Sequence, residues 1–246
     1  MVIHFWGNLK DLLRRPFRGR ETFEYELGRK ASVKDVVEAC GVPHTEVGRL
    51  TVAGRDVPFS YPCATNDLLD VYPLCAPVDV LIATLLRPVP LPAIAFAVDV
   101  NVGKLASLLR MAGFDTFYQN YISDPELAEV AVQEKRILLS KDKDLLKRKE
   151  VELGYLVREI HPEKQLAEVV HLFGLRDQFK PLSRCLSCNG LLQPVEKQEI
   201  IDQLEPLTKK YYDSFRQCRR CRKIYWPGSH RDQMLTILND YGKYCD

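Results

Sequence analysis

Residues 93–99 read Ala-Ile-Ala-Phe-Ala-Val-Asp, an unbroken apolar run that ends on an acidic residue. Such a run is typical of a strand that is buried on both faces of a sheet. Apolar residues at helical spacing follow it and predict a helix that ends at Gly113. The alternation continues, with further strands expected at 114–118, 136–140 and 154–157 and helices between and after them. Repeated strand–helix units predict a three-layer α/β domain, with a parallel sheet between helices.

Acidic residues stand where these predicted strands end. Asp99 follows the first strand, Asp142 and Asp144 follow the third, and Asp124 opens the helix between them. Ligands of open α/β sheets bind outside the carboxyl ends of the strands, so the four carboxylates are expected at one edge. Their mutual repulsion would raise their pKa values, and a divalent cation such as Mg²⁺ or Mn²⁺ would remove that conflict. Two such ions about 4 Å apart could activate water against a phosphodiester, whereas Asp99 and Asp142 more than about 10 Å apart would exclude a shared site.

The same acids also have a structural interpretation. Asp124, before Pro125, suits the N-cap of a helix. Asp142 or Asp144 could cap the short helix that follows them, and Asp99 could be an ordinary loop residue at a strand end. The spacing alone leaves both interpretations open.

Three motifs, in order along the chain, carry a family resemblance. Residues 98–106, 109–116 and 136–145 resemble the Mut-seven C-terminal RNase family, a branch of the PIN (PilT N-terminus) nucleases that ends in a zinc ribbon. The resemblance covers roughly residues 93–235. It implies a PIN-like fold and cleavage of single-stranded RNA with Mg²⁺ or Mn²⁺.

The resemblance also assigns roles to the acids. It makes Asp99 the first-strand acid, Asp124 the acid that opens the later helix, and Asp142 the acid after the third strand, all three holding metal. Asp144 would be a further ligand or would position water. Many PIN domains carry another acid on a helix before the Asp124 position, but this interval offers only Asp115, which we expect at a strand start. The number of catalytic metals is therefore left open.

The C-terminal third carries a metal-binding pattern. Four of the eight cysteines form two Cys-x-x-Cys pairs, and four thiolates suit a tetrahedral, structural Zn²⁺. An iron–sulfur cluster or a redox dithiol are the alternatives. The polar residues 194–213 predict a helical or loop insertion between the pairs. The predicted zinc ligands are Cys185, Cys188, Cys218 and Cys221.

Basic and aromatic residues near these sites are candidates for RNA binding. Arginines beside Tyr225 and Trp226 offer phosphate contacts and base stacking, although the two aromatic rings could instead fill the core of the ribbon. His230 could reach the acids or cap the last helix. Arg110 and Lys141 lie near the acids in sequence, where solvated surface charge is the other interpretation. The candidate nucleic-acid-binding residues are Arg110, Lys141, Arg219, Arg220, Arg222, Tyr225, Trp226 and His230.

The N-terminal part predicts a different fold. Two strands, a helix between Ser32 and Gly41, and further strands resemble the β-grasp fold of ubiquitin-like sulfur carriers. Such carriers act through a free C-terminal Gly-Gly, but residues 84–87 lead into the next domain without one. We therefore expect a binding or scaffolding role with a protein partner. The basic stretch 14–20 could extend an RNA path or be only a hairpin tip.

Composition sets the frame for these parts. The 246 residues are 46% apolar with a net charge of +2, which indicates an ordinary folded protein without a basic footprint over the whole chain. No apolar run approaches the roughly 20 residues that span a membrane, and no signal peptide is recognised, so we expect a cytoplasmic protein without a membrane partner. The expected domains are a ubiquitin-like β-grasp domain (1–87), a Pro-rich linker (88–92), a PIN-like nuclease domain (93–180), and a zinc ribbon with a C-terminal helix (181–246).

The predicted function is that of a PIN-type ribonuclease. It would hydrolyse phosphodiester bonds of single-stranded RNA through its Asp cluster, with catalytic Mg²⁺ or Mn²⁺ and structural Zn²⁺. The alternative is a non-catalytic RNA-binding or protein-adaptor module, in which the ribbon and the β-grasp domain bind and the acids only cap helices. The sequence does not choose RNA over DNA, or endonuclease over exonuclease.

Overall fold

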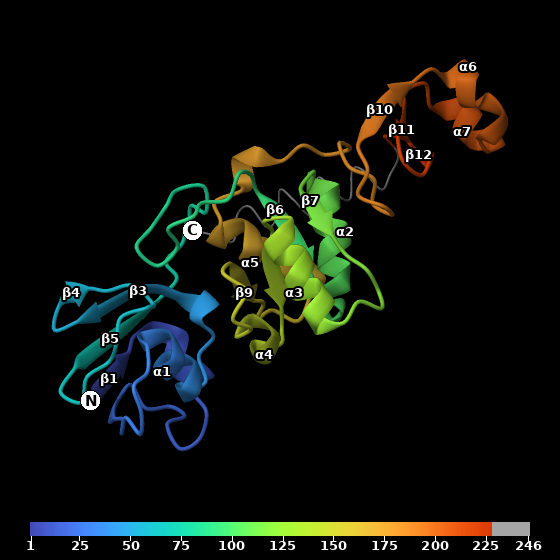
Figure 1. Ribbon diagram of the computed structural model, residues 1–246. Coiled ribbons are helices and arrows are strands. Elements are labelled where there is room, and N and C mark those ends of the chain that lie inside the picture. Colours follow the sequence, from blue (N-terminus) through green and yellow to red (C-terminus); the bar gives the residue numbers. More distant parts are fainter. Residues whose placement is uncertain (228–246) are drawn as a thin grey trace.

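A computed structural model describes residues 1–227 of the chain as three parts, each built on its own sheet (Figure 1). The first part is a mixed sheet in which β1 and β5 run parallel and the other neighbouring strands run antiparallel. This arrangement is the β-grasp fold that was predicted from the sequence. In sheet order its strands are β2 (Thr22–Glu24), β1 (Val2–Phe5), β5 (Leu68–Pro73), β3 (Val47–Val52) and β4 (Arg55–Asp56).

One helix, α1 (Val33–Cys40), packs its apolar face into the core of this first part. Ser32 caps it as predicted, because its side chain accepts from the Asp35 N–H at 3.2 Å while the Asp35 carboxylate accepts from the Ser32 N–H at 3.0 Å. The helix ends at Gly41, whose φ of +110° favours glycine. A Cβ at Gly41 would lie 2.7 Å from the backbone nitrogen of Arg14, so the helix end also fits closely against the β1–β2 connection.

The second part is a parallel four-stranded sheet, and it confirms the predicted α/β class. In sheet order its strands are β7 (Asp115–Phe117), β6 (Ala95–Val98), β8 (Ile137–Ser140) and β9 (Gly154–Leu156), all parallel. Its helices are α2 (Gly103–Ala112), α3 (Asp124–Gln133), α4 (Lys143–Leu146) and α5 (Pro162–Leu172).

Alternating residues of the strands sort these helices onto the two faces. Phe96 and Val98 of β6 share one apolar cluster with α2 and α5, whereas Ala97 shares another with α3. The second of these clusters also contains the core of the N-terminal part. The β-grasp domain therefore lies against the α3 face of the parallel sheet, and the two parts share one continuous apolar core.

Polar contacts reinforce this junction between the first two parts. Glu46 is almost fully buried, and its carboxylate accepts from the Leu156 N–H at 2.7 Å and from the Arg158 guanidinium at 2.5 Å. The Arg87 guanidinium donates to the carbonyls of Thr45 and Val47, each at 3.1 Å. The β-grasp domain is thus held against the α/β domain by buried polar contacts as well as by the shared apolar core.

The proline-containing stretch 88–92, expected as a linker, is anchored at Leu91, while its other four residues are exposed. Leu91 is buried in the α2 and α5 cluster, and its N–H donates to the carbonyl of Val80 at 2.9 Å. Earlier in the same connection, the Val78 N–H donates to the carbonyl of Leu172 at 2.7 Å. The connection therefore runs along the α/β domain from about residue 78 onward.

The third part is a small antiparallel sheet of β10 (Leu192–Val195), β11 (Phe215–Cys218) and β12 (Ile224–Tyr225). Between β10 and β11 the chain forms α6 (Lys197–Ile200) and α7 (Pro206–Tyr211), as the predicted insertion required. Ile200, Leu204 and Phe215 form its apolar core. The expected C-terminal helix lies outside the described residues. Among the helices that the structure describes, none is long and apolar enough to cross a membrane.

Candidate active site and metal centre

Asp99 lies directly after β6 and is nearly buried, with 4% of its surface exposed. Its Oδ2 accepts a hydrogen bond from the hydroxyl of Ser140, the last residue of β8, at 2.5 Å. The same Ser140 oxygen accepts from the N–H of Asp142 at 2.8 Å. One hydroxyl thus joins the Asp99 carboxylate to the backbone of Asp142, which places the two residues inside the limit of about 10 Å beyond which a shared site would be excluded.

Asn101 forms a second link between the Asp99 carboxylate and the segment that follows β8. Its amide donates to Asp99 Oδ2 at 2.5 Å, and its Oδ1 accepts from the N–H of Lys141 at 3.2 Å. Ser140 and Asn101 were not among the predicted site residues. Both are small polar residues two positions from a predicted acid, and that position was the available signal. They fix the Asp99 carboxylate and join the ends of the two central strands.

Asp124 is the first residue of α3, and the N-cap role considered for it belongs to another residue. Ser123 caps the helix, because the Glu126 carboxylate accepts from the Ser123 N–H at 2.9 Å and from its hydroxyl at 2.7 Å. Partial burial, followed by the negative charges of Asp99 and Asp142, raises the pKa of the Asp124 carboxyl, and Arg148 opposes this. The charges of Asp99 and Asp142 therefore reach the Asp124 carboxyl.

Asp142 combines a local structural role with its position at this edge. It is the N-cap of α4, and its carboxylate accepts from the Asp144 N–H at 2.7 Å. Asp144 itself points outward, with 89% of its side chain exposed and its carboxylate 3.3 Å from the Lys147 ammonium. The structure thus brings Asp99, Asp124 and Asp142 to one edge of the sheet and places Asp144 at its rim.

The three carboxylates do not form a closed ligand shell. In the part of the chain that the structure describes, the four cysteines are the one set of three or more potential ligands with all ligand atoms within 4.8 Å. Like charges repel, so spread carboxylates are expected wherever no cation holds them together. Their hard oxygen atoms nevertheless match the ligand preference of Mg²⁺ and Mn²⁺.

Asp115 lies at the opposite edge of the same sheet, where the strands start. It begins β7, as expected, and lies 2.6 Å from Arg136 and 3.0 Å from Arg184. Burial opposes its ionisation, but hydrogen bonds from Arg136 and Asn189 and the two positive charges outweigh burial and lower its pKa. Because strands of a parallel sheet end together, a residue at a strand start lies away from the acids at strand ends. Asp115 therefore does not replace the missing helical acid.

Arg110 also serves this opposite edge. It lies in the last turn of α2, is 95% buried, and donates to the carbonyls of Thr116, Leu186 and Ser187 at 3.0, 2.9 and 3.2 Å. Its guanidinium thus ties the first cysteine knuckle to the α/β domain. Because its side chain is buried there, with Nε and Nη1 occupied, Arg110 is not available to a phosphate at the acid edge, the strand ends that carry Asp99, Asp124 and Asp142.

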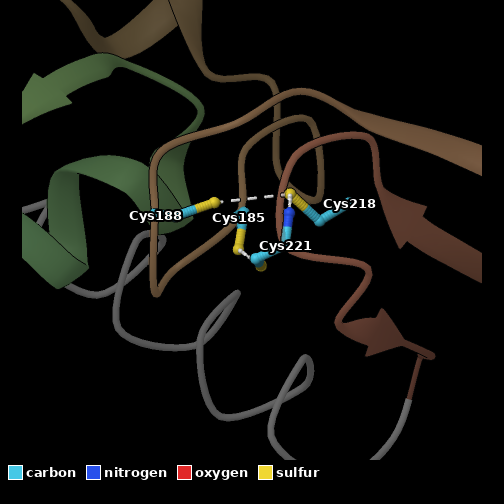
Figure 2. A group of neighbouring side chains, drawn as sticks. All are labelled: Cys185, Cys188, Cys218 and Cys221. Carbon is cyan, nitrogen blue, oxygen red and sulfur yellow. Dashed lines mark hydrogen bonds between the residues drawn. The ribbon is translucent and has the colours of Figure 1, made fainter.

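The four predicted zinc ligands meet in one place (Figure 2). The Sγ atoms of Cys188 and Cys218 lie 3.4 Å apart, and those of Cys185 and Cys221 lie 3.5 Å apart. These separations are much longer than a disulfide bond of about 2.05 Å. Tetrahedral Zn–S bonds of about 2.3 Å place sulfur atoms about 3.8 Å apart. The cluster therefore fits a four-thiolate metal site, and with the antiparallel sheet it forms a zinc-ribbon arrangement.

Tyr225 supports this cluster. Its hydroxyl lies 3.1 Å from Cys185 Sγ and accepts from the Leu186 N–H at 3.1 Å. Trp226 keeps 37% of its surface exposed, with its ring 6.4 Å from those of Tyr212 and Phe215. Tyr225 thus follows the core interpretation more closely than the stacking interpretation, while Trp226 is accessible.

The remaining RNA-binding candidates differ in their exposure to solvent. Arg219 is exposed and donates to the side chain of Gln193 at 2.9 Å, and Arg220 and Arg222 are also exposed. Lys141 is half-buried beside the acid edge. His230 lies outside the described residues.

A parallel four-stranded α/β sheet with carboxylates at the ends of its strands, joined to a four-cysteine ribbon, defines the class of PIN-like nucleases with a zinc ribbon. Within that class the chain belongs to the Mut7-C family, because residues 94–238 match the Mut7-C RNAse domain and residues 1–79 match the Mut7-C ubiquitin domain. Membership of this RNase family implies a nuclease acting on a nucleic acid. Neither a curated protein nor a solved structure gives a match to the chain.

Proposed function

We propose that the protein is a divalent-metal-dependent ribonuclease that hydrolyses phosphodiester bonds of single-stranded RNA. The observation that carries the proposal is geometric: hydrogen bonds from Ser140 and Asn101 hold the Asp99 carboxylate at the strand ends, and the same Ser140 hydroxyl accepts from the N–H of Asp142. Burial, followed by the charges of Asp99 and Asp142, raises the pKa of Asp124 at this edge. Carboxylates gathered at the ends of strands without a cationic partner are costly unless they hold a cation, because their like charges repel.

In this proposal Asp99, Asp124 and Asp142 hold Mg²⁺ or Mn²⁺. The metal supplies activation of water and neutralisation of the charge that develops on the phosphate. Ser140 and Asn101 keep the Asp99 carboxylate in one orientation through their hydrogen bonds of 2.5 Å each. The Asn101 amide also places the N–H of Lys141, and with it the start of the segment that carries Asp142.

Asp144 has a lesser part in this proposal. Its exposed carboxylate, paired with Lys147, suits a role in positioning water or an outer ligand, rather than one in the central shell. The four cysteines hold a structural Zn²⁺ that leaves no open coordination position. The exposed Trp226 and the arginines of the second knuckle are the candidates for RNA contact from the ribbon. A cytoplasmic location is part of the same proposal.

The test is cleavage of labelled single-stranded RNA with Mn²⁺ or Mg²⁺. Wild type is compared with Asp99→Asn and Asp142→Asn, and with Asp177→Asn as a matched control. Asp177 is an exposed acid in the turn after α5, away from the ends of the strands. We expect both site variants to lose cleavage and the control to keep it, with zinc content and fold retained in all.

Binding of the metal has a readout that does not depend on cleavage. A ligand that binds only the native state stabilises the protein by RT ln(1 + [L]/Kd). Added Mn²⁺ should therefore raise the melting temperature of the wild type and of Asp177→Asn, and should raise it less in Asp99→Asn. RNA binding with neither cleavage nor a Mn²⁺ effect would instead support the non-catalytic adaptor.

A further inference from the structure

The connection between β1 and β2 carries four arginines that have no role in the proposed cleavage reaction. We call residues 14–20 the basic loop, with Arg14, Arg15, Arg18 and Arg20. All four arginines are exposed, and in the described part of the chain none of them forms a salt bridge. The nearby Lys10 contrasts with them, because it pairs with Glu21 at 2.5 Å.

The basic loop is held in place by its single aromatic residue. The ring of Phe17 stacks on that of Phe23, with centroids 4.2 Å apart and planes 14° apart. The Phe17 N–H donates to the carbonyl of Arg14 at 2.9 Å, and the Arg20 N–H donates to the carbonyl of Phe17 at 3.0 Å. Phe17 thus takes the inner side of the loop and leaves the arginines on its outer side.

The loop begins beside the acid edge of the α/β domain. The Lys143 ammonium donates to the carbonyl of Leu12 at 3.1 Å, and Lys143 directly follows Asp142. Leu12 and Leu13 are buried in the cluster that also contains Leu145 of α4. In Figure 1 the N-terminal part lies beside α4 accordingly. Arg14 is two residues after Leu12. Because consecutive Cα atoms are about 3.8 Å apart, Arg14 lies close to this contact.

Two basic segments from different parts of the chain therefore meet next to Asp142. Residues 10–21 carry five basic and two acidic residues, and residues 141–149 carry the same numbers, so each has a net charge of +3. The whole chain has only +2, so positive charge is concentrated here. Charges spread along two segments suit a ligand with repeated negative charge better than a single phosphate group.

We propose that the basic loop of the ubiquitin-like domain binds the phosphate backbone of the RNA strand as it leaves the acid edge. This proposal rests on the proposed function and deepens it, because it assigns the substrate a length that reaches beyond the scissile phosphate. The β-grasp domain then contributes to the substrate-binding surface through its fixed junction with α3 and α4. The arginines fit single-stranded RNA of any sequence, since phosphate contacts carry no base information.

The test measures RNA binding without cleavage. Fluorescence anisotropy follows labelled single-stranded RNA of about 5 and about 20 nucleotides, in a zinc-loaded Asp99→Asn background without added Mg²⁺ or Mn²⁺. Arg18→Gln with Arg20→Gln is compared with Arg55→Gln plus Arg176→Gln. Arg55 lies on β4, and Arg176 lies after the C-terminal end of α5 at the opposite sheet edge; both are exposed. Thermal unfolding checks the fold of both variants.

For the long RNA we expect the loop variant to lose affinity and the control to keep it. Each phosphate contact with a single strand contributes about 0.7 to the slope of log K against log salt, so the two substitutions should reduce the slope by about 1.4. The loss should be smaller for the short RNA, which does not reach both the acid edge and the loop.

The outcomes separate this proposal from the proposed function. Loop-dependent binding of the long RNA by a protein that never cleaves would support the basic loop while overturning the nuclease. Cleavage by the wild type, with loop and control variants binding the long RNA equally, would overturn the basic loop and leave the nuclease. Equal binding by all variants would also assign the loop to another ligand, such as an acidic protein surface. An equal loss for both RNA lengths would contradict contact with the strand beyond the site.

Discussion

The two edges of the parallel sheet treat their acidic residues in opposite ways. At the strand starts, Asp115 is enclosed by Arg136, Arg184 and Asn189, and its pKa is lowered. At the strand ends, burial followed by the charges of Asp99 and Asp142 raises the pKa of Asp124. Within the described residues, none of these three acids forms a salt bridge. An acid paired with a cation stabilises the fold, whereas an acid without a cationic partner is available to a bound cation.

The zinc ribbon contacts the α/β domain at the edge where the strands start, beside Asp115. Its first knuckle is joined to the α/β domain through Arg110, and through Asn189, whose side chain accepts from the Thr116 N–H at 3.1 Å and donates to Asp115 at 2.8 Å. The four-cysteine site is thus coupled to the stabilising edge and is separate from the acid edge. Four predictions use this difference, and they are ordered by the size of the expected effect.

Loss of the ribbon metal should have the largest effect. Structural Zn²⁺ contributes roughly 10–16 kcal/mol of binding free energy in small zinc modules, and that energy is folding energy. We expect Cys188→Ser to abolish zinc binding, unfold the ribbon and expose residues 185–225 to protease. Zinc content and limited proteolysis measure this. Cys75→Ser, an exposed cysteine outside the cluster, is the control and should change neither. An intact ribbon in zinc-free Cys188→Ser would contradict the structural role.

Asp99→Asn should separate activity from stability. Several kcal/mol of transition-state stabilisation depend on a catalytic metal, so we expect cleavage to fall by at least about 100-fold. Asparagine can still accept from Ser140 and Asn101 through its amide oxygen, so the free energy of unfolding should fall by only about 1 kcal/mol. Cleavage kinetics and denaturant unfolding check the two halves. A variant that is fully active, or that loses activity only because it unfolds, would contradict the assignment.

Asp115→Asn should show the reverse behaviour. Its partner Arg136 has only 12% of its side chain exposed, so removing the carboxylate leaves a largely buried cation without its main partner. We expect a loss of about 2 kcal/mol in the free energy of unfolding, with cleavage per folded molecule unchanged. Asp213→Asn is the control, because Asp213 pairs with Lys197 while 91% exposed and should give no measurable change. A strong loss of cleavage in a stable Asp115→Asn protein would place Asp115 in the active site after all.

The sequence predicted the acids at the strand ends better than the contacts at the strand starts. The continuous apolar runs before Asp99 and before Asp142 located the strand ends, and the family motifs then named the acids. The cysteine spacing likewise located the metal site without any tertiary information. The partners of Asp115 and Arg110 could not be found in this way. They depend on how the knuckle docks onto the sheet, and Arg110 contacts carbonyls 76 and 77 residues away in the chain.

The smallest expected effect is a difference in how the two edges respond to pH. The pKa of Asp115 lies below its ordinary value of 3.8, so its stabilisation is fully present above pH 3.8 and is lost as the pH falls through its folded-state pKa. The pKa of Asp124 lies above 3.8, so the fold favours its neutral form, and this advantage disappears as the pH rises through its folded-state pKa. The charged form therefore costs stability at neutral pH. Because Asp124 is largely exposed, Asp124→Asn should gain only a few tenths of a kcal/mol there.

Denaturant unfolding of Asp124→Asn, Asp115→Asn and wild type is measured between about pH 3 and pH 7, without added Mg²⁺ or Mn²⁺. It gives the sign of the change in the free energy of unfolding for each variant. At neutral pH we expect a small gain for Asp124→Asn and a loss for Asp115→Asn, and both differences should shrink toward pH 3 as carboxyl groups become protonated in the native and unfolded states. Asp177→Asn should follow the wild type throughout. Saturating Mn²⁺ should turn the gain of Asp124→Asn into a loss, because a bound cation replaces repulsion with attraction. If Asp124→Asn destabilised the metal-free protein at neutral pH, the carboxylate would belong to the fold rather than to the site, and the contrast between the two edges would fail.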